Sequence, residues 1–275
     1  MAQPLKETAQ LIEEKCTILS KPFSKGRKRS LDKDCNQTKN EIIFIVIIEM
    51  KSLLMVQKGT TMPNTAEGKN THETLNVVFD IGNVLLRWDP PNLYRQLFEG
   101  DEEKVAYFLT HICSHEWNLE QDRGRSWEDA TELLVSQFPE WENPIRAYYD
   151  RWWDMLTGPI DVNGKILEEL SDKKHPVYAI TNFSAHALRE CQAKYPFLNR
   201  FEGMIISSDE ELVKPDRDIF DVFFARYNLK PENCVFIDDS LPNIETADQL
   251  GMKTIHFLLG KTDLRNELKK LGVPV

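Results

Sequence analysis

The chain has 275 residues, of which 41% are hydrophobic and 28% charged, and these proportions are typical of a globular protein in water. Its length predicts one domain with an elaboration, or two small domains. Residues 1–73 carry a net charge of +3 and residues 74–275 a net charge of −13. This acidic body argues against a nucleic-acid-binding surface, which needs a basic stripe. It still allows an anionic substrate that a divalent cation and one lysine bind locally.

The N-terminal segment, residues 1–73, differs in composition from the rest. Residues 21–33 are basic and contain glycine and serine, which indicates a solvated, disordered arm. Residues 42–48 are apolar, but a membrane span needs about 20 apolar residues, and no small-residue cleavage site for a secretory signal lies nearby. This run fits an extra strand, a membrane-surface segment or an aggregation-prone stretch, and the natural protein could instead start at Met62. We expect a disordered or dispensable extension and no stable membrane span.

The cysteines give a weak indication of the cellular compartment. There are five, an odd number, and none forms a CxxC pair: Cys16, Cys35, Cys113, Cys191 and Cys234. A scattered, odd set is more typical of reduced thiols than of a disulfide framework. We therefore expect a cytoplasmic protein.

From residue 74 onward, strand and helix patterns alternate, which predicts an α/β fold with a parallel sheet of about five strands flanked by helices. The expected strands are 75–79, 176–180, 203–207, 234–237 and 253–257. The expected helices around the sheet are 162–173, 184–195, 216–228 and 240–250.

The long connection after the first strand shows only helical patterns. Its expected helices are 91–99, 101–113, 126–137 and 142–156. We therefore predict an α/β core made of residues 74–88 and 159–275, with a helical insertion at residues 89–158.

Polar side chains stand at the ends of the predicted strands. Asp80 follows the first strand, Thr181 and Asn182 end the second, and Asp238 and Asp239 end the strand that begins at residue 234. The C-terminal ends of parallel strands are where open α/β sheets bind ligands. A lone carboxylate buried there costs several kcal/mol unless something such as a metal ion compensates. Each residue also has an ordinary explanation, since Asp and Thr often cap turns.

Lys214, just before Pro215, completes a set of four motifs in chain order, although a single lysine is more often a solvated surface residue. Together the four motifs resemble those of the haloacid dehalogenase superfamily, over residues 75 to about 260. The resemblance implies a Rossmann-like core with an all-helical cap inserted after the first strand.

The same resemblance implies roles for individual residues. Asp80 would be the nucleophile, and Lys214 would balance the paired anions of Asp80 and a phosphate. Thr181 and Asn182 would bind the phosphate. Mg²⁺ would be held by the Asp80 and Asp239 carboxylates and the Gly82 backbone carbonyl, with Asp238 and Asn243 orienting these groups.

Position 82 departs from the phosphatase pattern. Most phosphatases of this superfamily carry an acid–base aspartate two residues after the nucleophile, and this chain has Gly82 there. Three interpretations follow: a phosphatase for a good leaving group whose proton comes from water or a cap residue, a metal-independent 2-haloacid dehalogenase, or a low-activity member that binds a ligand. The pair of Asp238 and Asp239 favours a metal and a phosphate. The Asp-Ile-Gly-Asn-Val motif at residues 80–84 also resembles a subgroup of small sugar-phosphate phosphatases.

The cap offers candidates for reading the substrate, a small phosphate ester or halo acid. Residues 117–127 are dense in polar and aromatic groups, where Asn118 is a candidate contact and Arg123 could hold an anion in a bidentate fork. Asp122 or Glu120 could supply the missing proton. The ordinary alternative is a helix–helix loop with surface charge pairs. Substrate identity and oligomeric state stay open.

A chain that begins at Met62 should melt and turn over like the full-length chain, because residues 1–61 contribute none of the motifs. Thermal melts of the two chains would check this expectation. A much lower melting temperature for the shorter chain would show that residues 42–48 are part of the folded structure.

Overall fold

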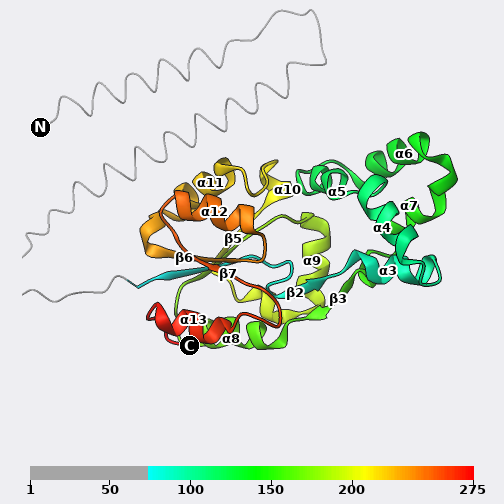
Figure 1. Cartoon of the computed structure of the whole chain (residues 1–275). Helices are drawn as coiled ribbons and strands as arrows, with labels where there is room; N and C mark the ends of the chain where they lie inside the picture. The colour runs from blue at the N-terminus through cyan, green and yellow to red at the C-terminus, as the bar shows by residue number, and fades with distance from the viewer. Residues whose placement is uncertain (1–73) are drawn as a thin grey trace, which may run out of the picture. The chain divides into compact units, whose positions relative to one another are not determined.

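The computed structural model describes residues 74–275, so the expectations for residues 1–73, the apolar run at 42–48 among them, lie outside the described residues. Five parallel strands form one sheet in the order β5-β4-β1-β6-β7 (Figure 1). Their bounds are β1 Asn76–Phe79, β4 Val177–Thr181, β5 Gly203–Ile206, β6 Cys234–Asp238 and β7 Lys253–His256. The expected five-stranded parallel sheet is confirmed.

Helices cover both faces of this sheet because its central strands are apolar on both sides. Val77 and Phe79 of β1 face one cluster, and Val78 faces the other. The first cluster includes residues of α8 (Asp161–Asp172), α9 (Ala185–Lys194) and α13 (Leu264–Lys270). The second includes residues of α11 (Arg217–Tyr227) and α12 (Leu241–Gln249). A near-continuous apolar strand is what a doubly covered parallel sheet requires.

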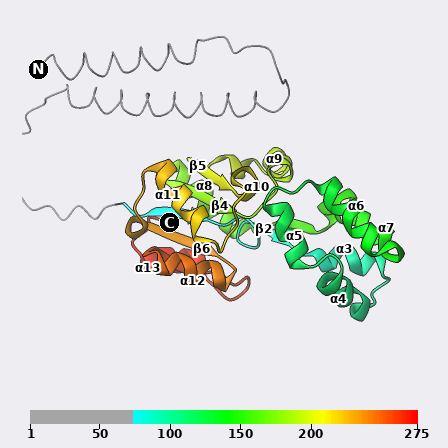
Figure 2. The same cartoon turned by 90° about the horizontal axis from the view of Figure 1, so that it is seen from above.

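The insertion after β1 is helical, as expected, and forms a separate lobe beside the sheet (Figure 2). Its helices are α3 (Pro90–Leu97), α4 (Glu102–His111), α5 (His115–Asp122), α6 (Trp127–Gln137) and α7 (Glu142–Asp150). Three of them begin at a side-chain cap, where Asp101, Ser114 and Ser126 accept a hydrogen bond from a backbone N–H of the first turn. The lobe packs around its own apolar cluster, so it has a core independent of the sheet.

The structure corrects the sequence-based elements at several points. Two short strands, β2 (Leu86–Trp88) and β3 (Leu156–Pro159), pair antiparallel at the base of the cap, and the sequence predicted neither of them. The helix expected over 142–156 ends at Asp150, and α5 occupies part of the stretch that we treated as a possible loop. The remaining elements are α10 (Ser207–Glu210) and four 3-10 turns, η1 (Pro139–Trp141), η2 (Trp152–Asp154), η3 (Pro196–Asn199) and η4 (Pro231–Asn233).

The expectations about membrane spans and cysteines can be compared with the structure only within residues 74–275. Within residues 74–275, every helix is too short or too polar to cross a bilayer. Cys113, Cys191 and Cys234 are buried and free, in keeping with the expectation of reduced thiols.

Candidate active site

The pairing of β1 with β6 brings the acidic strand ends together. The backbone N–H of Asp80 donates to the carbonyl of Ile237 at 2.8 Å, so Asp80 lies beside the start of the Asp238–Asp239 pair. Asp80 is only 7% exposed, and its Oδ1 lies 2.8 Å from Nζ of Lys214. The sheet register therefore gathers three carboxylates at one edge, as the strand-end positions predict.

Lys214 is buried between two of these carboxylates. Its Nζ lies 2.8 Å from Oδ1 of Asp80, 2.7 Å from Oδ2 of Asp238 and 2.9 Å from the carbonyl of Ile180. Burial acts to lower the pKa of Lys214, but Asp238 and Asp80 outweigh it and leave that pKa raised. The ammonium therefore stays charged with its three N–H donors used, and it is not the solvated lysine of the ordinary alternative.

Asn182 fixes the backbone from which Lys214 projects. Its Oδ1 accepts from the Lys214 backbone N–H at 2.8 Å, and its Nδ2 donates to the Lys214 carbonyl at 2.9 Å. Both halves of the amide are thus bonded to Lys214, and Asn182 also lines the cavity, so its phosphate contact stays a prediction. Thr181, the last residue of β4, is fully buried, and its Oγ1 has no hydrogen-bond partner. An unpaired buried hydroxyl costs about 1–3 kcal/mol.

The two aspartates of the pair have different surroundings. Asp238 is fully buried, and both of its carboxylate oxygens are occupied by Lys214, Asn243 and the Ser240 N–H, at 2.7–3.1 Å. Asp239 is only partly buried and accepts one side-chain hydrogen bond on Oδ2, from Asn83 at 3.1 Å. The free coordination capacity of the pair therefore belongs to Asp239.

The acidic cluster fits a hard divalent cation. Oxygens of Asp80, Asp238 and Asp239 lie within 4.8 Å of one another, and these three carboxylates face one lysine. Burial, opposed by Lys214 and reinforced by Asp238, raises the pKa of Asp80 to about 7. Burial and Asp238 likewise raise the pKa of Asp239. Such uncompensated carboxylate oxygens are the ligands that Mg²⁺ prefers, and a bound cation would relieve their repulsion.

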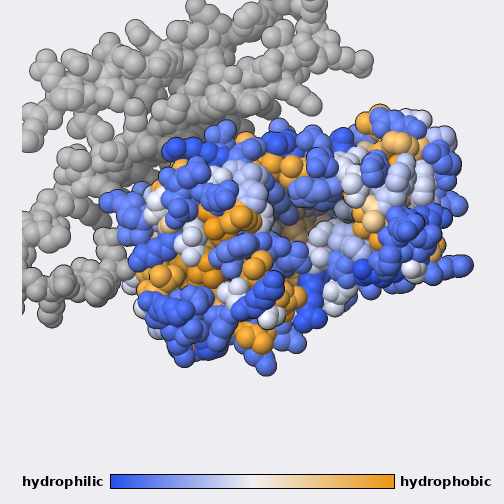
Figure 3. Space-filling view, in the orientation of Figure 1, coloured by the Kyte–Doolittle hydropathy of each residue, from blue (hydrophilic) through white to orange (hydrophobic). Residues whose placement is uncertain are grey.

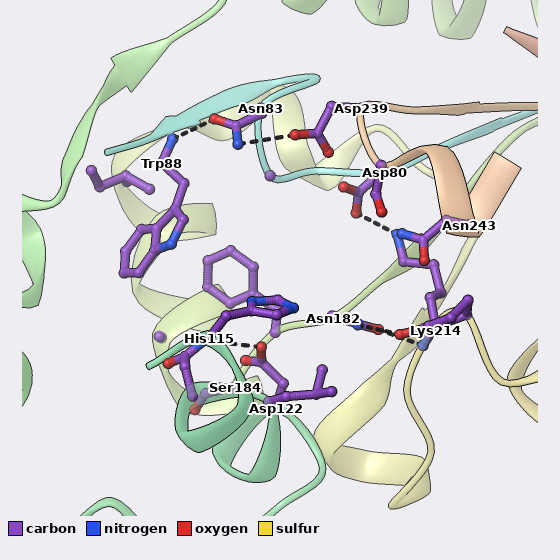
Figure 4. Close-up of a pocket in the computed structure, with 18 of the residues that line it drawn as sticks. Asp80, Asn83, Trp88, His115, Asp122, Asn182, Ser184, Lys214, Asp239 and Asn243 are labelled. Carbon is purple, nitrogen blue, oxygen red and sulfur yellow. Dashed lines mark hydrogen bonds and ion pairs between the residues drawn. The ribbon is translucent and has the colours of Figure 1, made fainter. Parts of the chain in front are cut away.

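A cavity of about 440 Å³ opens beside Asp80, between the sheet edge and the cap, and Figure 3 shows the surface hollowed there. This volume lies within the usual range for small-molecule sites. Its apolar walls include Trp88, Leu119, Trp127, Trp152, Leu156, Phe183 and Ala187. Its polar lining includes Asp80, Asn83, His115, Asn118, Asp122, Asn182, Ser184, Lys214, Asp239 and Asn243, most of which Figure 4 labels.

Helix α5 presents one face to this cavity. The lining residues His115, Asn118, Leu119 and Asp122 have the i, i+3, i+4, i+7 spacing of a single helical face. Asn118 therefore lines the cavity, its contact with substrate stays a prediction, and its Nδ2 donates to Oδ2 of Asp122 at 3.1 Å. Burial, followed by the charge of Asp80 and opposed by Lys214, raises the pKa of Asp122 to about 7.

Arg123 lies one residue further around α5 and does not line the cavity. Its guanidinium lies 3.3 Å from Oδ2 of Asp216 and 3.8 Å from Oε1 of Glu120. The expected anion fork is thus engaged in a contact between cap and core. Glu120 is exposed and also lies outside the lining, which leaves Asp122 as the cap carboxylate of the cavity.

Most of the apolar residues that line the cavity were not identified from the sequence. Trp88, Trp127, Leu156 and Phe183 come from four separate elements or loops, and only the folded chain brings them together. Trp152 packs against the apolar cluster of the cap and also lines the cavity. The one available signal was the aromatic density of the cap segments.

The sequence of this chain matches a known protein family. The model of the haloacid dehalogenase-like hydrolase family matches residues 75–251, more than half of the chain. The chain belongs to this hydrolase family.

Individual relatives are distant. A sesquiterpene phosphatase of Aspergillus oryzae, astK, is 26% identical over 184 residues, which span 66% of this chain and 88% of that protein. The family enzyme bt-2542 of Bacteroides thetaiotaomicron, solved with magnesium and inorganic phosphate, has a TM-score of 0.53 at 21% identity, covering 70% of this chain and 98% of that one. An L-2-haloacid dehalogenase of Xanthobacter autotrophicus has a TM-score of 0.50 at 17% identity, covering 73% and 84%. The two structural matches show a shared fold.

Lys214→Met should destabilise the protein by about 3–5 kcal/mol, because it leaves Asp80 and Asp238 buried without their cation. Urea unfolding measures this change, and Lys165→Met, at an exposed position of α8, is the matched control with an expected change within about 0.5 kcal/mol. Equal stabilities for the two variants would contradict the structural importance of the buried lysine.

Mg²⁺ should raise the melting temperature of the wild-type protein, because binding to the folded state alone contributes about 2.7 kcal/mol at a hundredfold excess over Kd. Asp239→Ala should lose this increment, whereas Glu245→Ala, on the exposed side of α12, should keep it. The readout is the difference between melts with millimolar Mg²⁺ and with chelator for each variant. An increment that survives in Asp239→Ala would place the cation elsewhere.

Proposed function

We propose that this hydrolase is a Mg²⁺-dependent phosphatase of small phosphomonoesters that acts through an aspartyl phosphate on Asp80. The observation that carries the proposal is the buried cluster of Asp80, Asp238 and Asp239 with a single lysine. Three carboxylates and one ammonium leave two negative charges at the sheet edge, and a divalent cation balances them. Bound Mg²⁺ would supply charge neutralisation for the phosphoryl group and for the attacking carboxylate.

The protein's own groups then have complementary tasks. Asp80 attacks phosphorus with one carboxylate oxygen while its Oδ1 stays paired with Lys214. Lys214 offsets the charge that Asp80 and the phosphate share, and Asn182 holds it in place. Thr181, at the end of β4, has an Oγ1 without a hydrogen-bond partner, and this hydroxyl would donate to a phosphate oxygen. Asp238 and Asn243 keep Lys214 and the Asp239 loop oriented.

The cavity lining supports a phosphatase over a 2-haloacid dehalogenase. A 2-halo acid carries its own carboxylate, and without a metal ion the strongest partner for it is a lysine or arginine beside the nucleophile. Among the described residues that line the cavity, Lys214 is the only lysine or arginine, and both of its ion pairs are internal. The likeness to the Xanthobacter dehalogenase shows the fold alone and does not change this preference.

The walls of the cavity also favour an apolar organic group on the ester. Trp88, Trp127, Trp152 and Phe183 line the same cavity as the acidic edge, and the alcohol part of a phosphoester would pack against them. Burying apolar surface there contributes about 25 cal/mol per Å². The Aspergillus relative is named for activity on a sesquiterpene, and the same kind of substrate, an apolar alcohol phosphate, fits this wall better than a sugar phosphate.

Asp80→Asn should lower kcat/KM for 4-nitrophenyl phosphate by more than about 10³-fold, as expected when a nucleophile is removed. The fold should survive because the amide has the shape of the carboxylate. Borohydride reduction of the wild-type enzyme during turnover should trap the aspartyl phosphate at residue 80. Turnover of 2-chloropropionate in chelator, with no turnover of any phosphate ester, would instead support the dehalogenase interpretation.

A further inference from the structure

Gly82 leaves the proposed phosphatase without an acid–base side chain two residues after the nucleophile. When Asp80 displaces an alkyl alcohol from phosphorus, the departing oxygen is strongly basic and needs a proton. General acid–base help of this kind contributes about 10²–10⁴-fold in rate. Gly82 has no ionisable side chain, so we look for the source of this proton among the other groups at the cavity.

The candidates for the proton donor are the ionisable side chains that line the cavity. Among the described lining residues they are Asp80, Asp239, Lys214, His115 and Asp122. In the proposed function Asp80 is the nucleophile, Asp239 is a metal ligand and Lys214 is held by two carboxylates. His115, in the first turn of α5, is exposed, whereas Asp122 is partly buried at the end of that helix.

Asp122 faces the nucleophile across the cavity. Figure 4 shows its carboxyl group on the cap side of the open space and Asp80 on the core side. Burial raises the pKa of Asp122 to about 7, and the charge of Asp80 adds to this rise while Lys214 opposes it. A carboxyl group in these surroundings can hold a proton near neutral pH, as a general acid requires.

We propose that Asp122, from the cap, is the general acid and base of the reaction, in place of the aspartate that position 82 lacks. This assignment rests on the proposed phosphatase function. In the first step a carboxylate oxygen of Asp80 bonds to phosphorus, the bond from phosphorus to the ester oxygen breaks, and that oxygen takes the proton of Asp122. The products are the free alcohol, the aspartyl phosphate and the Asp122 carboxylate.

In the second step Asp122 acts as the base. A water oxygen attacks phosphorus while its proton passes to the Asp122 carboxylate, and the bond from phosphorus to Asp80 breaks with its electron pair returning to the Asp80 carboxylate. Inorganic phosphate leaves, and Asp122 is protonated again for the next cycle. One ester and one water thus give one alcohol and one phosphate, with both aspartates restored.

The structure holds Asp122 at three points. Asn118 donates to its Oδ2 at 3.1 Å, which orients the carboxyl group. The hydroxyl of Ser207, at the start of α10 in the core, donates to its backbone carbonyl at 2.6 Å. The neighbouring Arg123 pairs with Asp216 of the core. The acid is therefore positioned when cap and core are in contact.

The test compares esters with good and poor leaving groups in the same enzyme preparation. For Asp122→Asn, kcat/KM for an alkyl ester such as 2-phenylethyl phosphate should fall about 10²–10⁴-fold, and that for 4-nitrophenyl phosphate less than tenfold. The ratio of the two values is independent of the folded fraction. The variant should also release a burst of nitrophenolate and accumulate phosphoenzyme, because the base for hydrolysis is missing.

Controls separate the possible outcomes. Glu120→Gln, on the exposed side of α5, should leave both rates within twofold, and Asp122→Glu should react with the alkyl ester at least tenfold faster than Asp122→Asn. Equal losses on both esters, or a selective loss in His115→Gln in place of Asp122→Asn, would overturn the assignment of Asp122. A wild-type enzyme that turns over neither ester with Mg²⁺ would overturn the phosphatase proposal itself.

Discussion

The site depends on one buried ammonium group. Nζ of Lys214 bridges Asp80 and Asp238 at 2.8 and 2.7 Å and thereby joins the ends of two neighbouring strands to the loop before α11. Without it, two desolvated carboxylates would repel each other at the centre of the sheet edge, a cost that pairing with a cation removes. The hydrogen bonds of Asn182 and Asn243 have this lysine and its partner as their targets, so much of the local polar network serves to keep one charge in place.

The core and the cap contribute different kinds of groups to the site. The core holds charges whose positions are fixed by sheet register, and the cap contributes aromatic walls and the face of α5. Apolar side chains beside the acidic edge lower the local polarity, which strengthens electrostatic interactions there. A family fold shared with both phosphatases and dehalogenases therefore says little about the reaction by itself, and the difference lies in which charges the cavity leaves unbalanced.

The core and its acidic edge were predictable from sequence because buried parallel strands are short apolar runs, and their polar C-terminal residues must meet. Asp80, Lys214 and Asp239 followed from that rule together with the family resemblance. Helix α5 was not predictable, since its cavity face carries His115, Asn118 and Asp122 and so lacks an apolar period. The strands β2 and β3 have only three and four residues, too few for a pattern. Asn182 and Lys214, which are hydrogen-bonded to each other, lie 32 positions apart in the chain, so no local sequence pattern predicts this contact.

The hydroxyl of Ser207 links the cap to the loop after β4. It donates to the Asp122 carbonyl in the cap and accepts from the backbone N–H of Phe183 at 2.9 Å, in the loop after β4. Phe183 lines the cavity, so one small side chain sets the spacing between a wall of the cavity and the helix opposite. Replacing the cap with that of another family member would therefore not by itself transfer that member's substrate specificity, because the cap depends on this contact with the core. The grafted helix would need a carbonyl at this place to keep its alignment with the core.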